Sequence, residues 1–298
     1  MSKELARDLI SAGVHFGHAV SRWNPKMAPY VFGKRGMIHI IDVKETLKGL
    51  LIAKKLLADV VSSGKDVVFV GTKRQAQKAV IKTAEKCGMH YVSQRWLGGM
   101  LTNFRTIRTR LQRLEELEAL QASGKLDAES KKQAARLKRE MNKILVNLGG
   151  VRKMNRLPGA LVVVDAKKET TALREAAKLG VVTVGIIDTD SDPDTVDVAI
   201  PANDDSIKAV DILLSELAEA VALGKTMVRI TPQTEVTGRG RSRRRALASA
   251  MAEEEGAATE QAPPAAREEP EPEEAAVAVE SGEQSPEAQS PSSEGPAQ

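Results

Sequence analysis

The stretch Val67-Val68-Phe69-Val70-Gly71-Thr72-Lys73-Arg74 decides the fold class, because a short apolar run here passes directly into a helical pattern. Four consecutive apolar residues fit a strand that is buried on both faces, and Gly71 ends it. The segment 73–87 then has helical periodicity, and Tyr91-Val92 indicates a second strand. A buried strand, a helix and another strand form the repeating unit of a parallel sheet.

The same alternation returns in the second half of the chain. It comprises expected strands at 161–164, 181–187 and 196–200 and expected helices at 168–179 and 204–223. A glycine, Gly180 or Gly224, follows each of these helices, as is typical of helix C-termini. Continuous apolar strands alternating with helices predict an α/β fold, with a parallel sheet and helices on both of its faces.

The N-terminal region is organised differently. Residues 3–10 suit a short amphipathic helix, and "YVFGKRGMIHII" (30–41) reads as two short strands around a turn at 33–36. Asp42 is a plausible helix N-cap, and Glu45 three residues later completes the pattern of a capping box. The helix that follows should extend to about Ser63.

Residues 103–148 contain no expected strand. Leu137, Met141, Ile144 and Leu148 follow one another at steps of four, three and four, which suits the seam of a coiled coil. The Ser123-Gly124 break, with Asp127 as a new N-cap, divides the stretch into two helices. We therefore expect an antiparallel coiled-coil helical hairpin inserted into the α/β domain.

Charge is distributed unevenly along the chain. Residues 251–298 carry thirteen Glu and one Arg, so a total charge of +4 leaves +16 for residues 1–250. A body this basic attracts polyanions, of which nucleic acid is the commonest. We expect an α/β nucleic-acid-binding domain at 1–226, a flexible basic arm at 227–250 around "GRGRSRRR" (238–245), and a disordered acidic tail at 251–298. One hypothesis is that the tail shields the arm.

The single cysteine, Cys87, excludes an internal disulfide and favours a reducing, cytosolic setting. It precedes Gly88, where a helix should end, and reads as a small buried thiol. No apolar run has the length of a membrane span, and Met1–Leu9 is charged rather than signal-like.

Cofactor and metal motifs are missing or incomplete. Neither a Walker loop nor G-x-G-x-x-G follows an expected strand, and no G-x-S-x-G or H-E-x-x-H occurs. His15 and His18, with His39 further on, lack local third and fourth ligands for zinc. We predict no cofactor and no metal. A small-molecule enzyme that uses Asp165 and Asp188 at strand ends stays an alternative, as does a free RNA chaperone that works through 238–245.

Two stretches place an aromatic ring among basic residues, namely 22–26 and "RWLGGMLTN" (95–103). Such neighbours suit phosphate contacts and base stacking. The cations Lys73 and Arg74 open a helix after Gly71, where an anion is favoured, although a plain surface helix end is equally compatible. The candidate RNA-binding residues are Arg22, Trp23, Asn24, Lys26, Lys73, Arg74, Arg95, Trp96, Asn103, Arg105 and Arg108, with both tryptophans either packing or stacking.

Six motifs occur in an order and at intervals that resemble one family. They are "GVHFGH" (13–18), "WNPKM" (23–27), "FVGTKRQA" (69–76), "RWLGGMLTN" (95–103), "LPGALVVVD" (157–165) and "DTDSDPD" (188–194). Together they closely resemble the bacterial small-subunit ribosomal protein "S two" family, over roughly residues 3–226. Residues 227–298 extend beyond that family core.

The resemblance implies a flavodoxin-like parallel sheet with a protruding coiled-coil hairpin. It also implies a structural, non-enzymatic role in translation: binding of small-subunit rRNA between the head and the body. The expected partners are this rRNA and neighbouring ribosomal proteins, including the large ribosomal protein "S one", which the family helps to hold on the subunit. It implies neither a membrane nor a small-molecule substrate.

Overall fold

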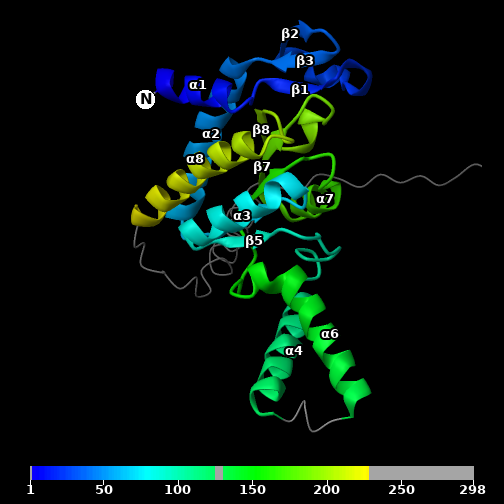
Figure 1. Ribbon diagram of the computed structural model, residues 1–298. Coiled ribbons are helices and arrows are strands. Elements are labelled where there is room, and N and C mark those ends of the chain that lie inside the picture. Colours follow the sequence, from blue (N-terminus) through cyan, green and yellow to red (C-terminus); the bar gives the residue numbers. More distant parts are fainter. Residues whose placement is uncertain (1, 125–129, 228–298) are drawn as a thin grey trace, which may run out of the picture. The chain divides into compact units, whose positions relative to one another are not determined.

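The computed structural model describes residues 2–124 and 130–227, all within one compact unit (Figure 1). Its centre is a sheet in which the five neighbouring strands are all parallel, in the order β5-β4-β6-β7-β8. The strands are β4 (Val67–Val70), β5 (His90–Val92), β6 (Ala160–Val164), β7 (Val182–Ile187) and β8 (Val198–Pro201). The predicted parallel sheet is confirmed.

The strand order is that of flavodoxin-like folds. The first strand of the sheet, β4, lies between the second and the third, which gives the order 2-1-3-4-5. The chain therefore reverses its direction of winding between β4 and β6. In open α/β sheets, the loops beyond the carboxyl ends of the strands at such a point form the usual binding crevice.

Apolar side chains fill both faces of the sheet. Phe69 and Val162 lie in one core together with α2 (Val43–Ser62), α3 (Arg74–Cys87) and α8 (Ile207–Thr226). Their neighbours Val70 and Val163 lie in a second core. That core also contains residues of α7 (Thr170–Leu179), the segment 96–111 and Leu148. Successive residues of a strand point to opposite faces, so uninterrupted apolar strands are the expected sequence of this sheet.

The N-terminal region forms α1 (Ser2–Ser11) and an antiparallel sheet of order β1-β3-β2. Its strands are β1 (Phe16–Ala19), β2 (Val31–Arg35) and β3 (Ile38–Ile41), with short 3-10 helices at Val20–Arg22 and Pro25–Tyr30. The predicted turn at 33–36 was too wide: β2 continues to Arg35, and Gly36, at φ 63°, begins a tight turn.

Two predicted helix ends need correction. Asp42 caps α2 by accepting from the Lys44 N–H at 2.9 Å, but Glu45 bonds to Lys48 instead of completing a capping box. Gly224 lies inside α8, which continues to Thr226. A Cβ at Gly224 would lie 2.8 Å from the Ala58 carbonyl oxygen, so the glycine permits close packing of α8 on α2.

The hairpin region consists of α4 (Phe104–Ala122) and α6 (Lys131–Leu148), which contact each other. The predicted break is confirmed, since Ser123 is the C-cap of α4. Ser130 caps α6 by accepting from the Gln133 N–H at 3.4 Å. The predicted cap Asp127 and the residues beyond 227 lie outside the described part of the chain. Buried Ile107 and Leu111 of α4 and Leu148 of α6 pack into the second core.

Cys87 is buried at the end of α3, as predicted, and burial raises the pKa of its thiol. No helix in the described ranges combines the length and the apolar character that crossing a bilayer requires.

Candidate nucleic-acid interface

Most of the candidate residues lie near the carboxyl edge of the parallel sheet, or in segments joined to it. Parallel strands end at a common edge, so the loops after β4, β5, β6 and β7 are neighbours there. The segment that contains Arg22, Trp23 and Asn24 joins this edge, because the Asn24 N–H donates to the Thr189 carbonyl oxygen at 2.9 Å. Stretches that are far apart in the sequence therefore meet.

Lys73 is engaged by acids of its own chain. Its Nζ lies 2.7 Å from Asp204 Oδ1, 2.6 Å from Asp205 Oδ1 and 3.9 Å from Asp165 Oδ2. Burial alone would lower the pKa of Lys73, but the hydrogen bonds to Asp204 and Asp205 raise it above its ordinary value. The geometry does not favour the expected phosphate contact, because this cation is already neutralised.

The N-terminus of α3 already has an anion beside it. The backbone N–H of Thr72 donates to Glu169 Oε1 at 3.3 Å, and the Thr72 hydroxyl donates to the same oxygen. Burial raises the pKa of Glu169. This buried glutamate was missed in the sequence, since nothing local to 71–74 points to a residue almost a hundred positions away. Arg74, in contrast, is exposed.

Lys26 and Arg108 also have partners within the chain. Lys26 Nζ lies 2.8 Å from Asp192 Oδ2 and 2.7 Å from Asp194 Oδ2. Arg108 donates to the Met154 carbonyl oxygen at 3.2 Å and to the Asn155 side chain. Both lie near the surface, so their contacts are weaker constraints than those of Lys73.

Four candidate arginines have no such partner. Among the residues that the structure describes, the side chains of Arg22, Arg74, Arg95 and Arg105 are exposed and form no ion pair. Nearby acids are instead matched by lysines, for example Asp190 by Lys167 at 2.9 Å. Within the described part of the chain, these arginines therefore carry uncompensated positive charge.

Trp96 packs in the core and offers no open ring for stacking. Only 7% of its surface is exposed, and its Nε1 donates to Glu175 Oε1 at 3.2 Å. Glu175, on α7, also accepts from the backbone N–H groups of Gly99 at 2.7 Å and Leu101 at 3.0 Å. Of the two readings that the sequence left open, packing is the one that fits Trp96.

Trp23 and the two asparagines have local roles. Trp23 is half-buried, its ring centroid lies 5.2 Å from that of His39, and its Nε1 has no hydrogen-bond partner. Asn24 Oδ1 accepts from the Lys26 N–H at 3.1 Å. Asn103 Oδ1 accepts from the Thr106 hydroxyl at 2.8 Å.

One cluster could hold a cation. His18, Asp188 and Asp204 each offer a ligand atom, all within 4.8 Å of one another. Hydrogen bonding to Asp188 raises the pKa of His18 to about 9, and burial raises the pKa of Asp204 to about 7. The sequence did not reveal this group, because Asp188 and Asp204 are far from His18 along the chain and only the fold brings the three together.

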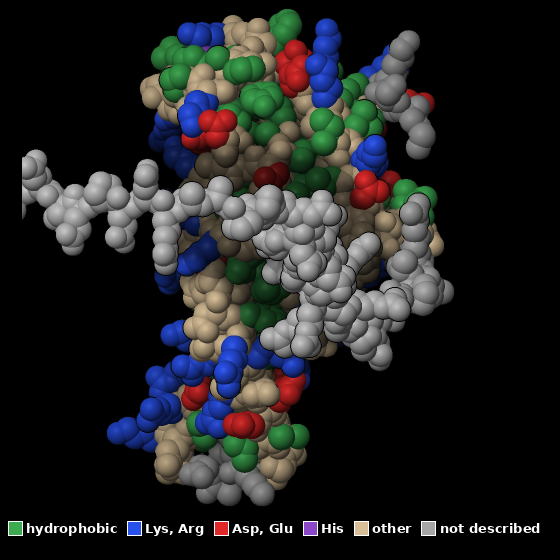
Figure 2. Space-filling model, turned by 180° about the vertical axis from the view of Figure 1, so that it is seen from behind, with side chains coloured by type: hydrophobic (Ala, Val, Ile, Leu, Met, Phe, Trp, Pro, Cys, Tyr) green, Lys and Arg blue, Asp and Glu red, His purple; other side chains and the backbone are tan. Residues whose placement is uncertain are grey.

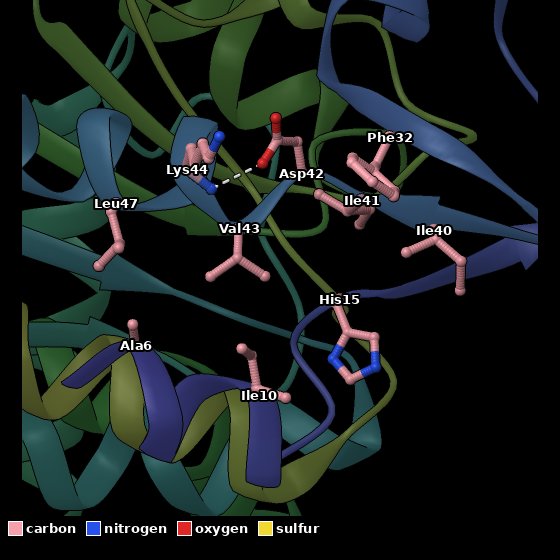
Figure 3. A pocket seen from close by; sticks show the side chains of 10 residues that line it. All are labelled: Ala6, Ile10, His15, Phe32, Ile40, Ile41, Asp42, Val43, Lys44 and Leu47. Carbon is pink, nitrogen blue, oxygen red and sulfur yellow. Dashed lines mark hydrogen bonds between the residues drawn. The ribbon is translucent and has the colours of Figure 1, made fainter. Parts of the chain in front are cut away.

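An open hollow of about 390 Å³ lies between α1, the start of α2 and the three-stranded sheet (Figure 3). Ile10, Phe32, Ile40, Val43 and Leu47 give it a mainly apolar lining. Phe32 is 79% exposed. The sequence did not indicate this hollow, because only the tertiary structure brings Ile10 of α1 and Phe32 of β2 to the same cavity.

Comparisons with known proteins identify relatives of this chain. Residues 9–224, which include all eleven candidate residues, match the family described as Ribosomal protein S2. The chain is 56% identical over 225 residues to the small ribosomal subunit protein uS2 of Rhodopirellula baltica, covering 76% of this chain and 86% of the relative. It is 46% identical over 238 residues to the protein of that name from Geotalea uraniireducens (80% and 93% covered). It is also 46% identical over 227 residues to the small ribosomal subunit protein uS2 of Koribacter versatilis (76% of this chain and 75% of the relative covered).

Proposed function

This chain belongs to the ribosomal protein S2 family, and from that premise we propose that it binds small-subunit rRNA between the head and the body of the subunit. As a member of this family it is a structural, non-enzymatic component of the small ribosomal subunit that acts in translation. Since its relatives are small ribosomal subunit proteins, we propose that this chain acts on the ribosome, in the cytoplasm.

The observation that carries the rRNA proposal is the group of four exposed arginines, Arg22, Arg74, Arg95 and Arg105. A guanidinium that lacks an acidic partner is free to bind a phosphate through two parallel hydrogen bonds. Lys26, Lys73 and Arg108 contribute less, because their charges are already engaged. Trp96 is buried beneath the proposed interface and stabilises its loop through Glu175. Trp23 is half-buried and Asn103 is exposed.

The test is sedimentation of a tagged full-length chain with small subunits in cell lysate, at low and high salt. We expect the wild-type chain to sediment with the small subunit at both salt concentrations. The variant Arg22→Gln/Arg74→Gln/Arg95→Gln/Arg105→Gln should move towards the top of the gradient at high salt, because fewer phosphates are neutralised.

The matched control removes four exposed lysines of the helices α2, α3, α7 and α8, namely Lys55, Lys78, Lys178 and Lys208, each replaced by Gln. It should sediment as wild type does. If the arginine variant also behaves as wild type, these arginines are not the rRNA contacts. A chain that ends at residue 226 should still bind, whereas a chaperone acting through 238–245 would lose its RNA.

We further propose that the hollow around Phe32 receives a segment of the large ribosomal protein "S one". A phenylalanine this exposed, among apolar neighbours, is typical of a surface that a partner covers. Phe32→Ala should lower the amount of "S one" on purified small subunits several-fold. Leu51→Ala, which removes another exposed apolar side chain (65% exposed), should not. Equal amounts of "S one" in both variants would exclude this hollow.

We also propose that α4 and α6 pack as an antiparallel coiled coil. Buried Leu114 and Leu117 on α4 and the pair Arg113 Nε–Glu140 Oε1 at 3.6 Å support this arrangement. Leu114→Asp should make the hairpin far more sensitive to protease than Arg110→Asp, an exposed position on the same helix. Similar cleavage of both variants would argue against the seam.

A further inference from the structure

The outer face of α6 carries a row of cations that the proposed interface does not use. The helix contains six Lys or Arg residues and a single acidic residue, Glu140. Lys132, Arg136, Arg139 and Lys143 follow one another at steps of four, three and four, and all four are exposed. At 3.6 residues per turn, they fall within about 60° of the helix circumference and span about 16 Å along its axis. We call this row the α6 stripe.

The α6 stripe points away from the rest of the hairpin. The apolar residues Leu137, Met141, Ile144 and Leu148 lie about 140° around the helix from the stripe. Leu148 is buried, and Ile144 packs against the second core. The stripe is therefore on the side of α6 that faces away from the apolar contacts of the described residues. Figure 2 shows Lys and Arg side chains gathered over the hairpin end, with acidic side chains scattered among them.

The charge of the stripe is not compensated within the described ranges. None of its four residues forms an ion pair there. In the α/β domain, by contrast, Lys54, Lys73 and Lys167 each lie close to a carboxylate. Lys131 and Lys132 also occupy the first turn of α6, which holds no acidic residue. Positive charge at a helix N-terminus opposes the helix dipole. The arrangement therefore does not serve the stability of the helix.

A polyanion fits this surface better than a folded protein does. Protein interfaces are usually centred on buried aromatic or aliphatic anchors. The stripe has none, because its residues are Lys and Arg and the intervening exposed positions Gln133, Ala135 and Asn142 are small or polar. Long, flexible cations in a row instead match the regular charges of a phosphate backbone and need no base sequence.

We propose that the α6 stripe binds the phosphate backbone of rRNA as a second contact, separate from the arginines at the carboxyl edge of the sheet. This rests on the proposed function, because it presumes that the chain binds small-subunit rRNA. Two contacts, one at the sheet and one on the hairpin, would fix the direction of the hairpin relative to the RNA.

The test measures rebinding of the full-length chain to small-subunit particles from which a high-salt wash has removed this protein, at increasing KCl concentrations. The stripe variant is Lys132→Gln/Arg136→Gln/Arg139→Gln/Lys143→Gln. The control is the Lys55/Lys78/Lys178/Lys208 variant described above, which loses the same charge. Thermal melts of all three proteins check that they fold.

We expect the stripe variant to bind roughly tenfold more weakly or worse, and its slope of log affinity against log salt to be shallower by about 3. The control should match wild type. If the stripe variant matches wild type, the inference is overturned while rRNA binding stands. If wild type itself does not rebind, the proposed function fails first. Equal weakening in the control would show that binding depends on the net charge of the chain and not on the position of the stripe, which also overturns the inference.

A crosslinking measurement distinguishes RNA from protein. Because Cys87 is the only cysteine, Arg139→Cys in a Cys87→Ala chain accepts a photoreactive label at one position of the stripe. Crosslinks from this position to rRNA support the proposal. Crosslinks exclusively to a neighbouring protein would show that the occupant is an acidic protein surface and overturn it.

Discussion

The indole Nε1 of Trp96 donates a hydrogen bond of 3.2 Å to Oε1 of Glu175, a buried carboxylate on α7. The same carboxylate accepts from three backbone N–H groups of the loop, those of Gly99, Leu101 and Thr102. The loop after β5 is thereby folded around a single side chain. Since α4 begins two residues after Thr102, Glu175 also holds the residues that directly precede this helix.

Replacing Glu175 by Gln should destabilise the protein. One carboxylate oxygen becomes an NH₂ group that faces N–H donors, so buried donors lose their acceptor. We expect the free energy of unfolding to fall by about 3 kcal/mol. Urea denaturation measures this. The control Glu219→Gln removes a carboxylate whose side chain is 56% exposed, and should cost less than about 0.5 kcal/mol. Equal effects would show that Glu175 does not organise the loop.

The same carboxylate should make stability depend on pH. Burial alone would raise the pKa of Glu175, but the N–H groups of Leu101, Gly99 and Thr102 outweigh it and hold the pKa below its ordinary value. A lowered pKa in the folded state means that the stabilisation is present above the ordinary pKa and is lost as the pH falls.

The difference in unfolding free energy between wild type and Glu175→Gln should therefore shrink as the pH is lowered from 6 to about 3.5. Urea denaturation at a series of pH values gives this difference directly. A difference that stays constant over this range would mean that the Glu175 carboxylate is not the charged acceptor of the loop.

The sequence was sufficient for the main sheet because its signals are local. An apolar run such as 67–70 predicts a buried strand without any knowledge of the strands beside it. Each helix is also close in sequence to the strand that it follows. The strand β1 was missed, since Phe16–Ala19 contains two small residues and a histidine and is a strand only because β3 lies beside it. The resemblance supplied the flavodoxin-like order, which local patterns do not encode.

The chemistry of the candidate site was less predictable, because each side chain's partner is distant in the sequence. Lys73 and Arg74 look equivalent as neighbours at a helix start, yet Lys73 meets Asp204 and Asp205 whereas Arg74 is exposed. The sequence left Trp96 open to packing or to stacking, and the distant Glu175, which accepts its N–H, is what favours packing. Basic and aromatic composition pointed to one region, but not to which of its side chains are exposed and which are engaged by partners within the chain.

The two glycines of "RWLGGMLTN" should respond differently to alanine. Gly99 has φ 88°, and a Cβ there would lie 3.2 Å from Asn103 Cβ, whereas a Cβ at Gly98 meets nothing within 4 Å. Gly99→Ala should lower the free energy of unfolding by about 1–2 kcal/mol through backbone strain, and Gly98→Ala should change it little. Thermal or urea melts of both variants provide the comparison. Similar losses would mean that this backbone conformation is not required.

Lys73 and Arg74 allow structural and RNA-binding cations to be separated. Lys73→Gln leaves Asp204, which is 1% exposed, without its cation, so we expect a loss of about 3 kcal/mol in unfolding free energy. Arg74→Gln removes an exposed charge and should leave stability nearly unchanged while weakening binding to small-subunit particles, with a salt dependence shallower by about 1. Urea melts and particle rebinding at several KCl concentrations, performed on both variants, separate the two effects. If Lys73→Gln instead melts as wild type does and loses particle binding, Lys73 contacts phosphate in the assembled subunit, and its contacts with Asp204 and Asp205 hold only before assembly.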